Sequence, residues 1–341
     1  KSMMIAHVEI IWPNQKRQLI SEIQPNQKLI LYQEDAIVDV IRNDDPKTKL
    51  FEEVKNFEYS HKENNYNDFK REIMLPHMLS TLGPRLAIGD VNGDELEDVF
   101  IGGAKGTAGG LFLQTSSGRY LKSNKINLEQ DALSEDMGAL FFDADGDKDL
   151  DLYVVSGGNE FEKTDPALKD RLYINRGMGD FIKSKNNLPD FISSGSVVKA
   201  ADYDNDGDKD LFVGGRILPN QYPYAPKSYL LDNNGEGIFK DVTQEIARGL
   251  QSIGMVSDAL WTDFNGDNQQ DLILVGEWMP ITLFENQNGK LKNVSQEIEG
   301  FKDSEGWWNA IAHADFDNDG DMDYVAGNFG LNSQLKTSVE Y

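Results

Sequence analysis

Five short segments of the sequence place acidic side chains on alternate positions, a spacing that favours metal binding. In the third, AADYDNDGDKDLFVGG (200–215), aspartates recur at every second position from Asp202 to Asp210. Carboxylates this close repel one another without a counter-ion. Calcium takes about 6–8 oxygen ligands, which short acidic loops supply, whereas zinc prefers histidine or cysteine. The chain has no cysteine, and its four histidines form no ligand spacing, so we expect calcium.

The five acidic loops align over nine positions. Aspartate occupies positions 1, 5 and 9 of every loop, and position 3 is aspartate or asparagine. We expect side-chain oxygens at positions 1, 3, 5 and 9, with the backbone carbonyl at position 7, to bind up to five calcium ions. The candidate ligands are Asp90, Asn92, Asp94, Leu96 and Asp98; Asp143, Asp145, Asp147, Asp149 and Asp151; Asp202, Asp204, Asp206, Asp208 and Asp210; Asp263, Asn265, Asp267, Gln269 and Asp271; and Asp315, Asp317, Asp319, Asp321 and Asp323. The first and fourth loops, with asparagine at position 3 and no acid at position 7, are expected to bind most weakly.

Strand-like apolar runs flank every loop, as in LAIG before and VFIGG after the first. An EF-hand is excluded, because its glutamate at position 12 is replaced by an apolar residue and no flanking helices are expected. Position 4 is always glycine or asparagine, which predicts a left-handed backbone there. Position 6 is glycine only at Gly207 and Gly320, so we expect the other three loops to be looser or to bind more weakly. Each loop is thus predicted to join two buried strands.

A second hairpin pattern lies between successive loops. It reads LFLQTSSGRY (111–120), RLYINRGMGDF (171–181), YLLDNNGEGIF (229–239) and TLFENQNGKL (282–291). One repeat of 52 to 61 residues therefore holds about four strands. Four-stranded units repeated radially are the blades of a β-propeller. We expect an all-β fold, a β-propeller with five visible calcium-loop repeats.

The repeats resemble a known family. Asp-x-Asp-x-Asp-Gly-x-x-Asp followed by Leu/Phe-x-Val-Gly-Gly, recurring over about 85–341, is similar to FG-GAP, or VCBS-type, repeats. Those repeats build the integrin α-subunit propeller and many bacterial surface proteins. The resemblance implies calcium at positions 1, 3, 5, 7 and 9 and a ring of seven blades. Since fourteen residues follow Gly327, we expect a propeller truncated at its C-terminus.

The first residues differ in character from the repeats. Trp12-Pro13 and Asn26-Gln27-Lys28-Leu29, within VEIIWPNQKRQLISEIQPNQKLILYQ (8–33), resemble the ASPIC/UnbV module. That module commonly accompanies such repeats in bacterial surface or secreted proteins. We therefore expect the C-terminal part of an ASPIC/UnbV-like β module at 1–34, a linker at 35–50 and the propeller at 51–341.

Charge and composition restrict the partners and the location. The net charge of −25 argues against nucleic acid, which needs basic patches. With no apolar run of about 18 residues, we expect no transmembrane segment. A signal peptide is not visible in the opening residues. Extracellular calcium modules bind with Kd of about 10⁻⁴–10⁻³ M and fill outside cells, so we expect an extracellular or bacterial cell-surface location.

Aromatic and cationic residues in the connections between strands are the candidates for a ligand site. Such platforms suit a glycan or a peptide, although the same residues could simply pack the blade interfaces. They are Arg216, Tyr222, Tyr224, Trp278, Trp307 and Trp308.

Three functions remain open. We expect a calcium-binding, non-catalytic scaffold for adhesion or for recognition of a protein or glycan. The alternative is a lyase-like enzyme acting on polysaccharide, for which the sequence offers no nucleophile elbow and no isolated pair of acids. An intracellular scaffold would be favoured by micromolar calcium affinity.

Overall fold

The computed structural model describes residues 5–12, 16–25, 27–36, 38–39 and 55–330. The chain divides into two compact units, Lys1–Val54 and Lys55–Tyr341, each described by itself. The boundaries expected from the sequence, at residues 34 and 50, remain a proposal.

The first unit carries a small antiparallel sheet in the order β1 (Ile5–Ile11), β2 (Lys16–Ile23), β3 (Val38–Asp39). A 3-10 turn, η1 (Gln33–Asp35), precedes β3. The Nε1 atom of Trp12 donates to Oε1 of Gln18 at 3.1 Å, which fixes the indole beside β2. Pro13 and Asn26, two residues of the ASPIC/UnbV resemblance, lie outside the described residues. The β3 strand falls within the segment expected to be a linker.

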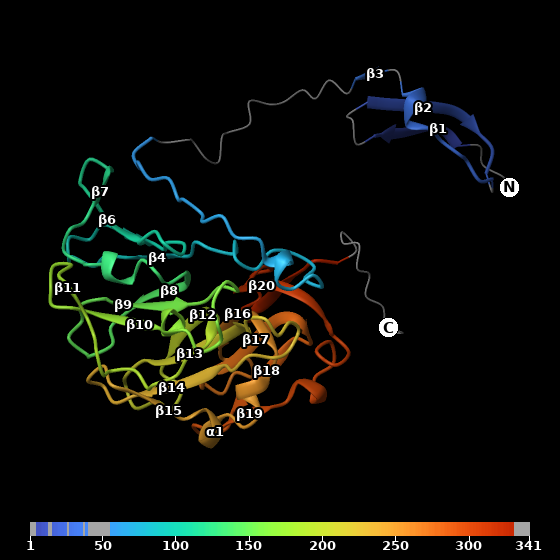
Figure 1. Cartoon of the computed structure of the whole chain (residues 1–341). Coiled ribbons are helices and arrows are strands. Elements are labelled where there is room, and N and C mark those ends of the chain that lie inside the picture. Colours follow the sequence, from blue (N-terminus) through green and yellow to red (C-terminus); the bar gives the residue numbers. More distant parts are fainter. Residues whose placement is uncertain (1–4, 13–15, 26, 37, 40–54, 331–341) are drawn as a thin grey trace. The chain divides into compact units, whose positions relative to one another are not determined.

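The second unit consists of successive antiparallel strand groups, which we call blades 1 to 5 (Figure 1). Blade 1 holds β4 (Leu86–Gly89), β5 (Asp98–Ile101), β6 (Gly110–Gln114) and β7 (Tyr120–Lys122), and blade 2 holds β8 (Asp136–Phe142), β9 (Asp151–Ser156), β10 (Arg171–Asn175) and β11 (Phe181–Lys183). Blade 3 holds β12 (Ser194–Ala201), β13 (Asp210–Ile217), β14 (Tyr229–Asn233) and β15 (Phe239–Asp241), and blade 4 holds β16 (Met255–Thr262), β17 (Asp271–Met279), β18 (Thr282–Asn286) and β19 (Leu291–Asn293). Within the described residues, blade 5 holds β20 (Gly306–Ala314) and β21 (Asp323–Asn328).

Short helices occupy connections between the strands. The one α-helical turn of the described residues is α1 (Thr243–Ile246), and the 3-10 turns of the second unit are η2 (Asp68–Lys70), η3 (Glu129–Asp131), η4 (Pro166–Leu168), η5 (Leu250–Ser252) and η6 (Ser295–Glu297). Strands dominate, so the all-β prediction is confirmed.

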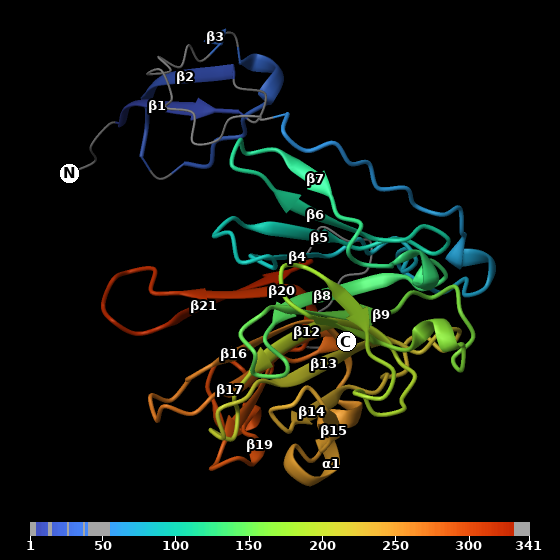
Figure 2. The same ribbon diagram turned by 90° about the vertical axis from the view of Figure 1, so that its left-hand side faces the viewer.

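The first strands of the five blades surround a common centre. They line one cavity of about 250 Å³, to which each contributes, through Leu86, Ala139, Val198, Ser257 and Ala310. In Figure 2 the blades follow one another in chain order around this centre. The predicted β-propeller is therefore confirmed, while the seven-bladed ring remains a prediction.

The hydrophobic core lies between blades rather than within one sheet. Strand β9 shows why: Leu152 and Val154 pack in the cluster shared with blade 1, whereas Tyr153 and Val155 pack in the cluster shared with blade 3. A strand buried on both faces needs a continuous apolar run, which explains the sequences that follow the first four acidic loops. In blade 5, every described residue of β21 is half-buried or exposed, so the prediction that each loop joins two buried strands is wrong there. Packing of neighbouring blades thus holds the loops in register.

Antiparallel pairing places the acidic loops at one end of every blade. Each loop joins the first strand to the second, as predicted, and the Gly-rich turn between the third and fourth strands lies at the same end. We call this the acidic-loop face. The ends of the second strands lie at the opposite end, which we call the strap face.

Residues 61–84, the strap, contact blades 2 to 5 along the strap face. Asn64 donates to Glu160 at 2.6 Å, and Asn159 donates to Asp68 at 3.1 Å. Glu72 accepts from the backbone N–H of Tyr222 at 2.9 Å. The strap therefore ties successive blades together on the face that lacks the acidic loops.

Candidate metal centres

Hydrogen bonds from the backbone hold all five acidic loops in one shape. The position-1 carboxylate accepts from N–H groups three to five residues ahead: Gly93 donates to Asp90, and Gly146 to Asp143, both at 2.8 Å. The position-5 carboxylate accepts from position 7 in each loop, for example from Asp149 to Asp147 at 2.9 Å. Partial burial acts to raise the pKa of Asp90, but its four N–H donors hold that pKa below the ordinary value. The first loop thus favours an ionised carboxylate at position 1.

Two residues of every loop have a left-handed backbone. Position 4 has a φ between 62° and 77° in all five, which confirms the prediction from glycine and asparagine. Position 6 is also left-handed in all five, including Glu95, Lys148 and Asn268. The three loops without glycine at position 6 thus adopt the same turn as the other two, and the expectation that they are looser or bind more weakly stays a prediction. At Lys148 the reason is a hydrogen bond of 3.0 Å from its N–H to Asp143.

Four of the five position-9 aspartates, those of blades 1 to 4, are buried at the base of their loops, whereas Asp323 of blade 5 is half-buried. In blades 1 to 4 one oxygen accepts from the N–H of position 2, and the other accepts from the last residue of the third strand, as Asp151 does from Ala144 at 2.8 Å and from Asn175 at 2.7 Å. Burial raises the pKa of Asp151 to about 7 and that of Asp210 to about 8. Without a cation, these carboxylates are held in the fold at an electrostatic cost.

The donor set fits a hard cation. Carboxylate oxygens lie within 4.8 Å of one another in three groups: Asp143, Asp145 and Asp151; Asp202, Asp204 and Asp206; and Asp315, Asp317 and Asp323. The Oδ1 atoms of Asp145 and Asp208 are buried without a hydrogen-bond partner. Burial and the neighbouring Asp206 raise the pKa of Asp208 to about 6. Of the two, Asp145 belongs to a converging group, and an unpartnered acceptor in such a group is what a bound divalent cation would satisfy.

The first and fourth loops differ at position 3. Asn92 donates from Nδ2 to Asp94 at 3.3 Å, and Asn265 donates to Asp267 at 3.1 Å. An amide that donates to the position-5 carboxylate partly satisfies it without a cation. This arrangement is consistent with weaker calcium binding in these two loops, which stays a prediction.

Four of the six ligand candidates meet on the strap face. Nε1 of Trp278 lies 2.5 Å from the hydroxyl of Tyr222, and the rings of Trp278 and Trp307 have centroids 5.3 Å apart. Arg216 is buried beneath them and paired with Glu277. We call Tyr222, Trp278, Trp307, Arg216 and Glu277, with His77 from the strap, the aromatic site. Arg216 supports this site from below instead of presenting its charge to solvent.

The other two candidates lie apart from it. Trp308 packs in the core between blades 4 and 5, and its Nε1 donates to the carbonyl of Ser304 at 2.9 Å. Tyr224 is 70% exposed, and within the described residues no contact joins it to the aromatic site. Trp308 is therefore a packing residue, the alternative that the sequence left open.

His77 and Glu277 were missed as site residues. Nε2 of His77 lies 2.8 Å from Oε1 of Glu277, and its ring packs 5.1 Å from that of Trp307. Burial acts to raise the pKa of Glu277, but His77 and Arg216 hold it below the ordinary value. Since 200 residues separate the pair, no local pattern could have joined them.

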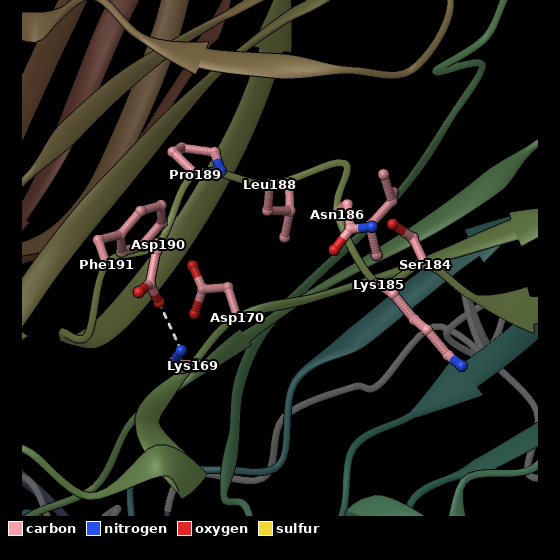
Figure 3. Close-up of a pocket in the computed structure, with 10 residues that line it drawn as sticks. Lys169, Asp170, Ser184, Lys185, Asn186, Leu188, Pro189, Asp190 and Phe191 are labelled. Atoms are coloured by element: carbon pink, nitrogen blue, oxygen red, sulfur yellow. Dashed lines mark hydrogen bonds and ion pairs between the residues drawn. The ribbon is translucent and has the colours of Figure 1, made fainter.

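A cavity of about 400 Å³ lies beside blade 2 and includes none of the predicted residues (Figure 3). Its rim carries the ion pair of Lys169 with Asp190 at 2.5 Å. Asp170 lies within it, but its two oxygens already accept from Tyr153 and Ser156, each at 2.8 Å. Asp170 is therefore satisfied internally, and Asp190 pairs with Lys169.

No helix of the described residues is both long and apolar enough to span a membrane.

No curated protein matches the chain. Among solved structures, the V. cholerae biofilm matrix protein Bap1 is similar at 16% identity and a TM-score of 0.36, over 80% of this chain and 37% of its own. The Dos1 propeller is similar at 13% identity and a TM-score of 0.38, over 67% of this chain and 61% of its own. The chain thus spans less than two thirds of either structure.

The family described as FG-GAP-like repeat matches residues 90–154, 143–213 and 263–326. Each match begins at position 1 of an acidic loop, and together the matches include all five loops. They cover more than half of the chain, and the chain therefore belongs to the FG-GAP-like repeat family.

Proposed function

We propose that this protein is a calcium-binding, non-catalytic β-propeller scaffold that recognises a protein or glycan outside the cell. The observation that carries the calcium part is the buried, unpartnered oxygen of Asp145, which lies among carboxylates that converge with those of Asp143 and Asp151. Calcium, when bound, supplies positive charge to those carboxylates. Five divalent ions would reduce the net charge from −25 to −15.

Calcium is proposed to act structurally, because each loop is tied to the core of its blade. The residues that would hold it are those at positions 1, 3, 5, 7 and 9, with position 7 acting through its carbonyl. Weak sites of the extracellular kind, with Kd of about 10⁻⁴–10⁻³ M, fill where calcium is abundant. This supports an extracellular or cell-surface location. The ASPIC/UnbV-like module and the seven-bladed ring belong to the same proposal.

The ligand is proposed to bind at the aromatic site. Trp278 has a φ of 56°, which is a strained backbone for a bulky residue. It is also the extra residue of a β-bulge, since Glu277 pairs with Trp307 and Met279 with Gly306. Bulges re-aim side chains next to functional sites. The strained bulge leaves the indole 41% exposed above the buried ion pair.

A binding screen tests this function. The full chain is applied in calcium to arrays of glycans and of extracellular proteins, and hits are repeated with Trp278→Ala. We expect a hit whose affinity falls about tenfold or more in that variant. The matched control is Tyr224→Ala, an exposed aromatic outside the aromatic site, which should bind as the wild type. If Trp278→Ala bound the ligand as tightly as Tyr224→Ala, the proposal that the ligand binds at the aromatic site would be contradicted.

A second candidate is a lyase-like enzyme acting on acidic polysaccharide. One observation favours it: the Tyr222 hydroxyl and the His77 imidazole lie in the same site as the Glu277 carboxylate. General acid–base catalysis uses such groups when they reach a substrate proton. The test is incubation with acidic polysaccharides, followed by measurement of chain shortening. Turnover lost in both His77→Gln and Tyr222→Phe would favour the enzyme over the scaffold.

A further inference from the structure

We infer that Asn175, Asn233 and Asn286 couple neighbouring calcium loops, so that an ion in one loop strengthens binding in the next. This inference rests on the proposed calcium function. The three asparagines are the last residues of β10, β14 and β18 and are almost fully buried. They recur in the second hairpin pattern as INR, DNN and ENQ.

Each asparagine bridges two acidic loops. Its Nδ2 donates to the position-2 carbonyl of the preceding blade and to the position-8 carbonyl of its own blade, while its backbone N–H donates to its own position-9 carboxylate. For Asn233 these acceptors are Ala144 at 2.8 Å, Lys209 at 3.2 Å and Asp210 at 2.9 Å. For Asn175 they are Val91, Leu150 and Asp151 at 2.8, 3.2 and 2.7 Å, and for Asn286 they are Tyr203, Gln270 and Asp271 at 2.6, 3.1 and 2.6 Å.

Hydrogen bonds within each loop make these bridges continuous. The position-9 carboxylate that holds the asparagine also accepts from the position-2 N–H of the same loop, as Asp151 does from Ala144 at 2.8 Å. The carbonyl of Ala144 then accepts from Asn233. The chain of bonds thus runs from the first loop through the second and third to the fourth.

The position-2 carbonyl and the position-9 carboxylate that bind the asparagine lie beside or among the candidate metal ligands. Position 2 lies between the ligands at positions 1 and 3, and position 9 is itself a candidate ligand. An ion that orders one loop would fix its position-9 carboxylate and so the asparagine. The asparagine would then fix the position-2 peptide of the neighbouring loop before that loop binds. The first ion has then already ordered part of the neighbouring loop, so the second ion loses less conformational entropy when it binds. This gives positive coupling between the two sites.

The third loop allows a site-resolved test. Tyr203 occupies its position 2 and stacks near Trp261, with centroids 6.4 Å apart. Terbium(III), an oxygen-seeking ion like calcium, would therefore report this loop by luminescence sensitised through these rings. The full chain is titrated with terbium as wild type, Asp145→Ala, Asn233→Leu and the double variant. Tyr203→Phe identifies the signal of the third loop.

We expect Asp145→Ala, which removes a ligand of the second loop, to weaken terbium binding at the third loop about fivefold or more. In the Asn233→Leu background, Asp145→Ala should cause no further loss. Two controls should leave the third loop unchanged. Asp317→Ala removes a ligand of the fifth loop, which no described asparagine joins to the third. Gln114→Ala alters the equivalent residue of blade 1, whose side chain forms no bridge among the described residues.

Two results overturn the inference alone: terbium affinity at the third loop that ignores Asp145→Ala, or a loss of equal size with and without Asn233. Absence of any sensitised signal in the wild type overturns the calcium proposal as well, so the two failures are distinguishable. Should circular dichroism show that Asn233→Leu is unfolded, Asn286→Leu with Asp267→Ala repeats the cycle for the third and fourth loops. Additive losses in that cycle contradict the coupling in the same way.

Discussion

Asp210 and Asn233 are joined by a hydrogen bond of 2.9 Å, in which the backbone N–H at the end of the third strand donates to a carboxylate at the base of an acidic loop. Both side chains are buried. The candidate metal loop and the core of the blade therefore share a residue, so that changes in one should be felt in the other.

Removal of calcium should destabilise the fold. A site filled at ten to a hundred times its Kd adds about 1.4–2.7 kcal/mol to the free energy of unfolding. Thermal unfolding in calcium and in chelator measures the difference, and we expect a midpoint lower by several degrees in chelator. Magnesium at equal ionic strength is the control and should restore little, because it fits a carboxylate-rich loop poorly. Identical midpoints in calcium and in chelator would contradict a structural role.

The stability of the metal-free protein should fall as pH rises towards 8. Burial raises the pKa of Asp151 to about 7 and that of Asp210 to about 8, from an ordinary value of 3.8. The folded state therefore favours the protonated form. The stability that this supplies is complete below the ordinary pKa and is lost as pH rises through the folded value. Urea unfolding in chelator across this range measures the effect.

In saturating calcium, the free energy of unfolding should instead rise with pH, because calcium stabilises the ionised carboxylates and competes with protons. The calcium-saturated protein is thus the internal control for the pH series. A metal-free protein whose unfolding free energy rises between about pH 5 and 8 would show that burial of these two acids does not dominate.

Replacement of a position-3 carboxylate by an amide should stabilise the metal-free protein and weaken its binding of calcium. Asp145→Asn removes a carboxylate, and burial and the neighbouring Asp147 raise the pKa of that group. We expect it to stabilise the metal-free protein by about 0.5–1 kcal/mol and to weaken calcium binding at the second loop. The reciprocal change, Asn92→Asp in the first loop, should strengthen binding there. Unfolding free energies and calcium titrations of both variants measure this, and a shift of the same sign in both metal states would be inconsistent with a cation site.

The ion pair beneath the aromatic site should tolerate replacement of both partners better than loss of one. Glu277→Gln leaves the guanidinium of Arg216 buried without its counter-charge, which costs about 3–5 kcal/mol. A double variant, Arg216→Met with Glu277→Leu, should recover much of that loss. Urea unfolding in saturating calcium measures all three proteins. A double variant as unstable as the single one would assign the cost to packing instead of charge.

The acidic loops were predictable because most of what shapes them lies within nine residues. Ligand types, spacing and the left-handed position 4 are all local. The left-handed backbone at position 6 was not predictable where that residue is not glycine, because Lys148 adopts a φ of 76° with its N–H bound to Asp143, and residue type alone does not reveal this hydrogen bond.

The aromatic site was predictable only in part. The ends of the second strands must share one face once the blades form, so that Tyr222 and Trp278 could be expected to approach. The position of His77 depends on the path of the strap across several blades, which no periodicity records. The bridging asparagines did carry a signal, since each closes the third strand of its repeat, but their partners in the preceding blade become evident only from the packing.

Calcium titration of the full chain by calorimetry, after treatment with chelator, tests the central claim most directly. The account predicts saturable heat for at least three ions, corresponding to the second, third and fifth loops, in which carboxylates converge. Heat for fewer than three ions, at calcium concentrations well above 10⁻³ M, the weak end of about 10⁻⁴–10⁻³ M for extracellular modules, would contradict it.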